Sequence, residues 1–194
     1  MPDHSHTETY SLPELASVKA KHPQNIIFSY LNINSIRNKI NDLNETIGGS
    51  VDILNISETK VDETFTESQF LLNRFSKPYR LDITSSSGGL LTYVNSNIPS
   101  KRLVDVVLPY DIQAIAIEIS IRKRKWVLVS VYRPPTQNLE YFLDQISNLV
   151  DFYEGKYSNF LIMGDFNELV SSNGIKKLHD SALFRLSYLA PNLF

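Results

Sequence analysis

The order of apolar runs along this chain restricts its fold more than any other feature. Asn25–Leu31 is a short apolar run rich in strand-forming residues, and Val51–Ser57 is a second one. Between them, from Ile36 to Ile47, aliphatic residues recur at the spacing of one helix face. A strand, a helix and a second strand form a crossover unit. The two strands are therefore predicted to be parallel, or at least to share one sheet.

The rest of the chain continues in the same mixed order. Leu90–Val94 is predicted to be a strand, and Ile112–Ile121 alternates isoleucine with small or polar residues. Trp126–Tyr132 would complete a hairpin with it. A second amphipathic helix is predicted over Asn138–Tyr153, followed by a strand at Asn159–Met163. About six strands and two helices predict an α/β fold, a two-layer β-sandwich flanked by helices.

Composition limits the domain count and the class of protein. The chain has 194 residues, 42% of them hydrophobic and 21% charged, which fits one folded domain rather than a disordered chain. Residues 1–24 are polar and are predicted to form a flexible N-terminal arm, with residues 25–194 as the domain. With no cysteine and no apolar run long enough to cross a membrane, we expect an intracellular protein without disulfide-linked or membrane partners.

Polar side chains follow four of the predicted strands. Loops at one edge of a sheet converge on one place, so these side chains are candidates for a shared site. Carboxylate and amide oxygens suit Mg²⁺, which often uses only one or two carboxylates and keeps several waters. Amides also bind phosphate oxygens and attacking water, so the set suits phosphodiester hydrolysis. The candidates are Asn32, Asn34, Glu58, Tyr132, Arg133, Asp165 and Asn167.

Each of these signals also has an ordinary structural explanation. Asparagines after a strand favour turns, and Gly164–Asn167 contains three turn-forming residues. A run of four basic residues lies at the predicted hairpin tip. It either contacts DNA backbone or only keeps the tip in water, and the second explanation is the commoner one. These residues are Arg122, Lys123, Arg124 and Lys125.

Four short motifs in order resemble the endonuclease/exonuclease/phosphatase superfamily, in particular the apurinic-type endonuclease domain of non-LTR (LINE-like) retrotransposons. They are Leu31–Arg37 (LNINSIR), Ser57–Lys60 (SETK), Val131–Pro135 (VYRPP) and Gly164–Asn167 (GDFN). The resemblance extends over about residues 25–170 and implies a DNase I-like four-layer α/β sandwich. It also implies Mg²⁺- or Mn²⁺-dependent nicking of DNA.

The resemblance assigns a role to each candidate. Glu58 would be the main metal ligand, with Asn32 and Asn34 bordering the metal and the phosphate. Asp165 would orient or deprotonate the attacking water. Tyr132 would contact the phosphate or the leaving oxygen, Asn167 would position phosphate or water, and Lys60 would steady the charge next to Glu58. Candidates for DNA contact, chosen for their positive charge, are Lys60, Arg133 and the hairpin-tip residues Arg122, Lys123, Arg124 and Lys125.

One feature of the family pattern is missing. The superfamily has a Ser-Asp-His motif or a variant after GDFN, and the residues up to Phe194 contain none. We therefore expect a domain that is incomplete at its C-terminus and lacks its last strands. Two alternatives to the DNA endonuclease follow. One is an inactive truncated remnant that binds DNA or protein weakly. The other is a phosphomonoesterase or phosphoinositide phosphatase. We expect a monomer, located in the nucleus if it acts as a retrotransposon endonuclease.

Overall fold

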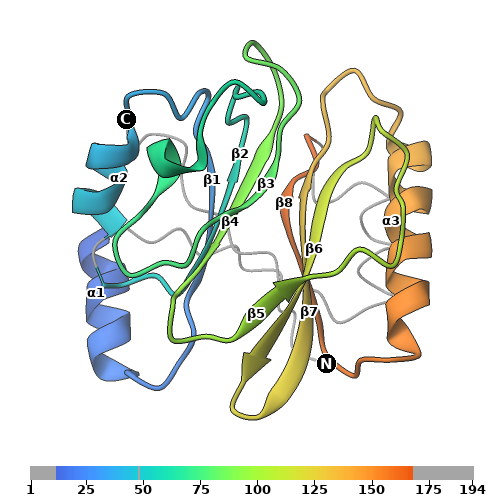
Figure 1. The fold of residues 1–194 in the computed structure, drawn as a ribbon. Coiled ribbons are helices and arrows are strands. Elements are labelled where there is room, and N and C mark those ends of the chain that lie inside the picture. The colour runs from blue at the N-terminus through green and yellow to red at the C-terminus, as the bar shows by residue number, and fades with distance from the viewer. Residues whose placement is uncertain (1–11, 48, 168–194) are drawn as a thin grey trace.

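The computed structural model describes residues 12–47 and 49–167, which form two stacked sheets with helices outside them (Figure 1). The helices are α1 (Leu12–Lys21), α2 (Ile40–Ile47) and α3 (Leu139–Glu154), with a 3₁₀ turn η1 (Glu67–Phe70). The strands are β1 (Phe28–Asn32), β2 (Ile53–Ser57), β3 (Tyr79–Leu81), β4 (Leu90–Val94), β5 (Ser100–Arg102), β6 (Gln113–Ile121), β7 (Arg124–Tyr132) and β8 (Phe160–Asp165).

The strand order is β1-β2-β4-β3 in one sheet and β5-β6-β7-β8 in the other. In each sheet one pair is parallel, β1 with β2 and β7 with β8, and the remaining pairs are antiparallel. Each parallel pair is joined through a helix, α2 in the first sheet and α3 in the second. These helices cover the outer faces of their sheets (Figure 1). The predicted two-layer sandwich flanked by helices, the fold class of a DNase I-like protein, is confirmed.

Three apolar clusters hold these layers together. The middle cluster lies between the sheets, where Ile115, Ile117 and Ile119 of β6 pack with Ile53 and Leu90 of the first sheet. The outer clusters lie under α2 and under α3. The alternation predicted for β6 is therefore confirmed, because its isoleucines point into the sandwich while its alanines face α3.

Polar side chains also lie in the centre of the sandwich. Asn55, Thr92 and Ser130 are completely buried. Asn55 Nδ2 donates to the carbonyl of Met163 at 3.1 Å, and Thr92 Oγ1 donates to Ser130 Oγ at 2.8 Å. Both bonds connect one sheet to the other. Because a buried polar group without a partner is costly, these bonds favour one alignment of the two sheets.

The first predicted helix begins later than expected, at Ile40 rather than at Ile36. The backbone of Asn34, Ser35 and Asn38 has positive φ, which is incompatible with a helix. The Ile36 N–H instead donates to the carbonyl of Thr59 at 3.0 Å. Periodicity of the side chains was therefore misleading here, because the segment before Ile40 pairs with the end of β2.

Other differences from the predictions involve short or peripheral elements. The three-residue strands β3 and β5 were not predicted. In the predicted N-terminal arm, where one helical turn was expected around Leu12–Ala20, the structure has a longer, ten-residue helix, α1. Lys19 Nζ in this helix lies 2.6 Å from Asp52 Oδ2, which connects it to the start of β2. The expectation of missing final strands falls on residues beyond 167, outside the described residues. No helix among the described residues is long and apolar enough to span a membrane.

Candidate active site

Two parallel strand pairs bring four candidate side chains to one end of the sandwich. Asn32 is the last residue of β1, and Glu58 follows the last residue of β2. In the second sheet, Tyr132 ends β7 and is paired directly with Asp165, the last residue of β8. In Figure 1 these four strands belong to the two stacked sheets between α2 and α3. The two sheets therefore contribute equally to one polar cluster.

Hydrogen bonds join these four side chains across the two sheets. Asn32 Nδ2 donates to Glu58 Oε1 at 2.8 Å and to Asp165 Oδ2 at 3.2 Å. The hydroxyl of Tyr132 donates to Glu58 Oε1 at 3.0 Å. Asp165 is buried, while the Glu58 side chain keeps 23% of its surface exposed. The structure thus holds two carboxylates near each other through neutral donors, with Glu58 open to solvent.

Asn34 and Lys60 lie at the exposed side of this cluster. The Lys60 ammonium donates to Asn34 Oδ1 and lies 4.0 Å from Glu58 Oε2. The Asn34 N–H donates to Asn32 Oδ1 at 3.2 Å, which fixes the Asn32 amide so that its NH₂ group faces the carboxylates. Asn34 therefore contacts the site through Lys60 and Asn32. Lys60 is the basic candidate that the structure places beside the carboxylates.

The segment after β8 is fixed by Arg133, which the sequence had suggested as a DNA contact. Arg133 is only 4% exposed, and its guanidinium donates to the carbonyls of Phe166 at 2.5 Å, Asn167 at 2.7 Å and Gln137. A side chain buried in this way contacts the protein's own backbone rather than DNA. The predicted DNA contact is corrected accordingly: Arg133 holds the segment after Asp165, which is Phe166 and Asn167.

Asn167 is exposed at the edge of the cluster. Its N–H donates to Asp165 Oδ1 at 2.8 Å, and its side-chain NH₂ donates to the carbonyl of Arg133 at 2.7 Å. Asp165 therefore accepts one bond at each carboxylate oxygen, from Asn167 and from Asn32. These two bonds fix its orientation before any substrate is present.

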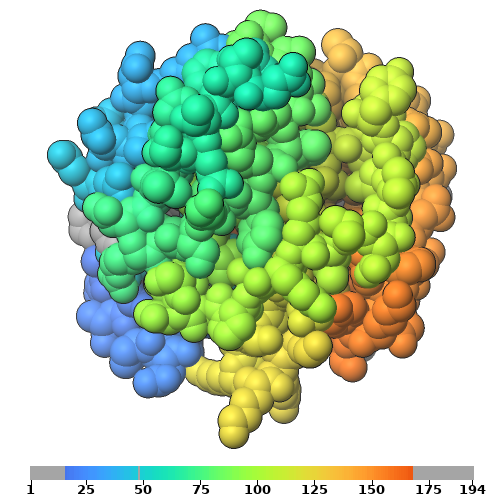
Figure 2. All heavy atoms as spheres, in the orientation of Figure 1, coloured from blue at the N-terminus to red at the C-terminus, as the bar shows by residue number. Residues whose placement is uncertain are grey.

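The structure does not bring the four basic residues of the hairpin tip to this cluster. The tip joins β6 to β7 and protrudes at the bottom of the molecule in Figure 2, while β7 leaves it and ends at Tyr132. A nine-residue strand is roughly 26 Å long. Lys125 Nζ lies 3.2 Å from Glu118, and Arg122 Nη2 donates to the carbonyl of Gln24 at 3.0 Å. The tip residues Arg122, Lys123, Arg124 and Lys125 are exposed but distant from Glu58.

The backbone around Glu58 has an uncommon conformation. Glu58 and Lys60 have φ values of 52° and 53°, in the left-handed region that non-glycine residues seldom adopt. Neighbouring loops stabilise it, because Ser35 N–H donates to the carbonyl of Glu58 at 2.7 Å and Lys60 N–H donates to that of Gly88 at 3.0 Å. Such local strain persists only where the surroundings fix it, and it is frequent at functional sites.

Burial and charge keep the Tyr132 hydroxyl protonated. Burial raises its pKa above the usual value of a tyrosine, and the nearby negative charge of Glu58 raises it further. The hydroxyl therefore stays a hydrogen-bond donor at neutral pH. It can donate to a carboxylate, as here, or to a phosphate oxygen.

Whether this cluster suits a metal ion depends on its donor atoms. Among residues 12–47 and 49–167, no three His, Cys, Asp or Glu side chains group closely enough to hold a metal. The cluster instead offers the carboxylates of Glu58 and Asp165, with asparagine side chains next to them and Glu58 partly exposed to water. A hard cation such as Mg²⁺ prefers oxygen donors, keeps several waters and needs only one or two carboxylates. The residues present fit that ion.

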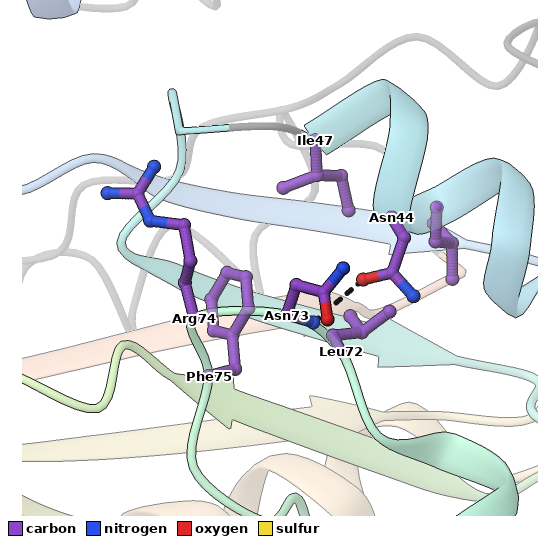
Figure 3. A pocket seen from close by; sticks show the side chains of 7 residues that line it. Asn44, Ile47, Leu72, Asn73, Arg74 and Phe75 are labelled. Atoms are coloured by element: carbon purple, nitrogen blue, oxygen red, sulfur yellow. Dashed lines mark hydrogen bonds between the residues drawn. The ribbon is translucent and has the colours of Figure 1, made fainter.

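A small pocket elsewhere does not contribute to the site. It lies between α2 and the segment 72–75, where Asn73 N–H donates to Asn44 Oδ1 at 2.7 Å (Figure 3). Its lining mixes apolar and polar side chains and contains no carboxylate, so it lacks a group that could hold a metal or accept a proton from water. The lining residues are Leu43, Asn44, Ile47, Leu72, Asn73, Arg74 and Phe75.

Comparisons with known proteins identify the family and the fold. Residues 29–185 match the sequence model of the Endonuclease/Exonuclease/phosphatase family. No curated protein matches the sequence. Among solved structures, the endonuclease domain of TRAS1, a telomere-specific non-LTR retrotransposon, is similar with a TM-score of 0.59 and 14% identity. That match covers 81% of this chain and 69% of the other.

Two further structures are similar at comparable levels. The APE2 catalytic domain of Xenopus laevis has a TM-score of 0.60 and 17% identity, over 73% of this chain and 58% of that one. The 3′ phosphatase NExo from Neisseria, bound to a product DNA hairpin, has a TM-score of 0.54 and 12% identity, over 77% and 60%. At these identities the likeness shows the shared fold.

Proposed function

This chain belongs to the Endonuclease/Exonuclease/phosphatase family, and from that premise we propose that it hydrolyses phosphodiester bonds in DNA with Mg²⁺ or Mn²⁺. The observation that supports this most is the joining of Glu58 and Asp165, from different sheets, through the amide of Asn32. Tyr132 adds a neutral donor to the same group. Two carboxylates with fixed neutral donors are suited to holding a cation and an attacking water together.

In this proposal the residues have separate tasks. Glu58 would hold the metal, because its carboxylate is partly exposed and its Oε2 lies 4.0 Å from Lys60 Nζ, beyond hydrogen-bond distance. Such a metal supplies Lewis-acid polarisation of the phosphoryl oxygen. Asp165 would orient the attacking water and accept its proton, since its carboxylate is fixed by Asn32 and Asn167.

The neutral groups would bind the phosphate. Asn32 and the protonated Tyr132 present hydrogen-bond donors toward the two carboxylates, where the phosphate has to enter. Lys60 and the exposed side chains of Asn34 and Asn167 lie at the rim of the cluster. Donors that are already in place lower the reorganisation needed in the transition state.

DNA is favoured over small phosphate esters by the similar structures. They include a retrotransposon endonuclease domain and a phosphatase bound to a DNA hairpin. The second candidate is a phosphomonoesterase, because that DNA-bound structure is itself a 3′ phosphatase. Comparing release of phosphate from a 3′-phosphorylated oligonucleotide with nicking of an intact strand separates the two activities.

The direct test is nicking of supercoiled plasmid with and without Mg²⁺. We expect metal-dependent nicking by the wild-type protein. We expect a loss of about 10²–10⁴-fold on Asp165→Asn, which removes the group that accepts the proton. Glu58→Gln should abolish the dependence on metal concentration. Asp144→Asn is the matched control, because Asp144 is an exposed carboxylate on α3 away from the cluster.

Two results would contradict the proposal. One is a wild-type protein that nicks no DNA in any divalent metal, which would favour a binding role without catalysis. The other is nicking that persists unchanged in both Glu58→Gln and Asp165→Asn, which would indicate a contaminating nuclease or a different site.

A further inference from the structure

We propose that Gln113 is a positioning residue that holds the Glu58–Lys60 segment in place for metal binding, an inference that rests on the proposed function. Gln113 is the first residue of β6 and belongs to the second sheet, whereas Glu58 belongs to the first. It has no direct contact with Glu58. Its effect is transmitted through the two glycines that precede β4, Gly88 and Gly89.

The Glu58–Lys60 segment is supported from one side by these glycines. The Lys60 N–H donates to the carbonyl of Gly88 at 3.0 Å, and the Thr59 N–H donates to that of Gly89 at 3.4 Å. Thr59 packs so closely that a Cβ on Gly89 would lie 2.3 Å from its hydroxyl. Any displacement of the glycine pair would therefore move the backbone on either side of Thr59, including Glu58.

Gln113 fixes the position of the glycine pair. Its side-chain Oε1 accepts from the Gly89 N–H at 2.9 Å, and the residue is only 5% exposed. A Cβ on Gly88 would lie 2.8 Å from the end of the same side chain. Both glycines also have positive φ, which side chains disfavour. The amide of Gln113 thus occupies the space that a side chain on Gly88 would need, and it binds the backbone of Gly89.

The location of Gln113 connects both halves of the site. It is paired in the sheet directly with Tyr132, whose hydroxyl donates to Glu58 Oε1. The backbone of Gln113 therefore fixes the position of the end of β7, and its side chain fixes the position of the loop beside Glu58. Glu58 and Tyr132 come from different sheets, so the distance between their side chains depends on how the sheets are aligned at this end. The contact of Gln113 with Gly89 fixes that alignment.

Removing the acceptor should weaken metal binding more than it weakens the fold. Gln113→Met keeps the length of the side chain but leaves the buried Gly89 N–H unpaired, which favours movement of the loop. Changing a residue that orients a metal ligand typically lowers metal affinity by about 10–100-fold. We expect the dissociation constant for Mn²⁺, measured by calorimetry, to rise by about tenfold.

The control variant breaks a similar contact elsewhere. Thr92→Val removes the buried bond from Thr92 to Ser130, which also joins the two sheets but lies in the middle of the sandwich. It should lower stability while leaving Mn²⁺ affinity unchanged.

A second readout is independent of metal. Amide exchange at Gly89 should be faster in Gln113→Met, and Gln113→Glu, which keeps an oxygen acceptor, should restore its protection.

The outcomes separate this inference from the proposed function. If wild-type protein binds no Mn²⁺ and nicks no DNA, the proposed function fails, and the positioning role is decided by amide exchange and by the NMR shifts of Thr59 and Lys60. If Gln113→Met leaves Gly89 exchange and those shifts as in wild type, the positioning role is wrong. Equal losses of Mn²⁺ affinity in Gln113→Met and Thr92→Val would also overturn it, since they would reflect general loosening.

Discussion

At the scale of single residues, backbone contacts decide which side chains are allowed near the site. Gly164 has φ of 152° and lies directly before Asp165. A Cβ at this position would be 1.8 Å from the carbonyl oxygen of Val131, its partner on β7. The close approach of β8 to β7 therefore requires glycine. The glycine of GDFN, which the sequence suggested as a turn residue, is therefore required by strand pairing. The chain turns only after it, where the Asn167 N–H donates to Asp165 Oδ1.

Gly164→Ala should destabilise the protein by about 3 kcal/mol or more, because it combines backbone strain with a collision that neither strand can relieve. The control is Gly155→Ala at the end of α3, where a Cβ would meet nothing within 4 Å and the backbone is already helical. That change should be neutral or stabilising by up to about 1 kcal/mol. Urea unfolding of both variants checks the prediction, and equal effects would contradict it.

A charged residue inside the second sheet gives a pH dependence. The pKa of Glu118 is lowered from 4.5, first by the bond from the Tyr157 hydroxyl at 2.5 Å and also by Lys125 and Lys101. A lowered pKa means that the folded state prefers the carboxylate. Its contribution to stability is therefore complete above pH 4.5 and is lost as pH falls through the folded pKa.

We expect the free energy of unfolding to fall less on acidification in Glu118→Gln than in wild type. Urea unfolding at neutral pH and on the acid side of 4.5 measures the difference. Tyr157→Phe should raise the Glu118 pKa toward its ordinary value, which carboxyl NMR titration would show directly. Identical acid dependence in wild type and Glu118→Gln would mean that the group contributes nothing.

At the scale of secondary-structure elements, the sequence predicted those helices and strands that bury one continuous apolar face. The alternating isoleucines of β6 and the apolar stripe of α3 were correctly placed, because each element buries one continuous face. The start of α2 was wrong because three positive φ values and a backbone bond to Thr59 are set by the loop of another strand. Strands β3 and β5 were missed because three residues give no periodicity.

The candidate site was predictable only in part, because contacts between distant segments leave no local pattern in the sequence. Side chains at strand ends could be identified from their order, but the burial of Arg133 and the role of Gln113 depend on tertiary contacts. Gln113 is a single polar residue at the start of an alternating strand, so no local pattern distinguishes it. The basic run at the hairpin tip was visible in the sequence, yet its distance from Glu58 follows from strand direction.

The N-terminus of α3 supports a prediction about that helix. Asn138 Oδ1 accepts from the Tyr141 N–H at 2.9 Å, which pairs one of the free donors of the first turn. Asn138→Ala should therefore cost about 1 kcal/mol of stability. Asn148→Ala is the control, because Asn148 is exposed within the same helix, where alanine is the better helix former. Thermal unfolding of both variants tests the cap, and a stabilised Asn138→Ala would contradict it.

The hairpin tip supports a second prediction for an element. Because the tip and the cluster lie at opposite ends of β7, the double variant Arg122→Ser/Lys123→Ser should nick plasmid at the wild-type rate and bind DNA with the same salt dependence. Lys60→Met should lower both the nicking rate and the affinity for DNA, since Lys60 lies beside Glu58. A marked loss of DNA affinity in the tip variant would show that bound DNA extends to that end.

At the scale of the whole molecule, the site exists only while the two sheets stay stacked. Asn32 and Glu58 come from one sheet, and Tyr132 and Asp165 from the other. The completely buried bonds of Asn55 and Thr92 between the sheets fix their alignment at the centre, and Gln113 joins them near the site. Metal binding and folding are therefore expected to be coupled.

Magnesium should stabilise the folded protein by mass action. At a free concentration about 100 times its dissociation constant, the free energy of unfolding should rise by ~2.7 kcal/mol. Urea unfolding followed by circular dichroism, with and without Mg²⁺, measures the rise. Glu58→Gln should show little of it, while the control Asp144→Asn should match wild type. An equal rise in Glu58→Gln would place the ion elsewhere on the protein.

The bond between Asn32 and Asp165 joins positions 133 residues apart. Proteins begin to fold from the N-terminal end while the ribosome is still adding residues. A nascent chain thus carries Asn32 and Glu58 long before Asp165 has been translated, and the edge of β7 stays open until β8 arrives. The proposed reaction therefore cannot occur on a nascent chain that lacks Asp165. If this protein cuts DNA as proposed, a nascent chain stays harmless at least until Asp165 has left the ribosome.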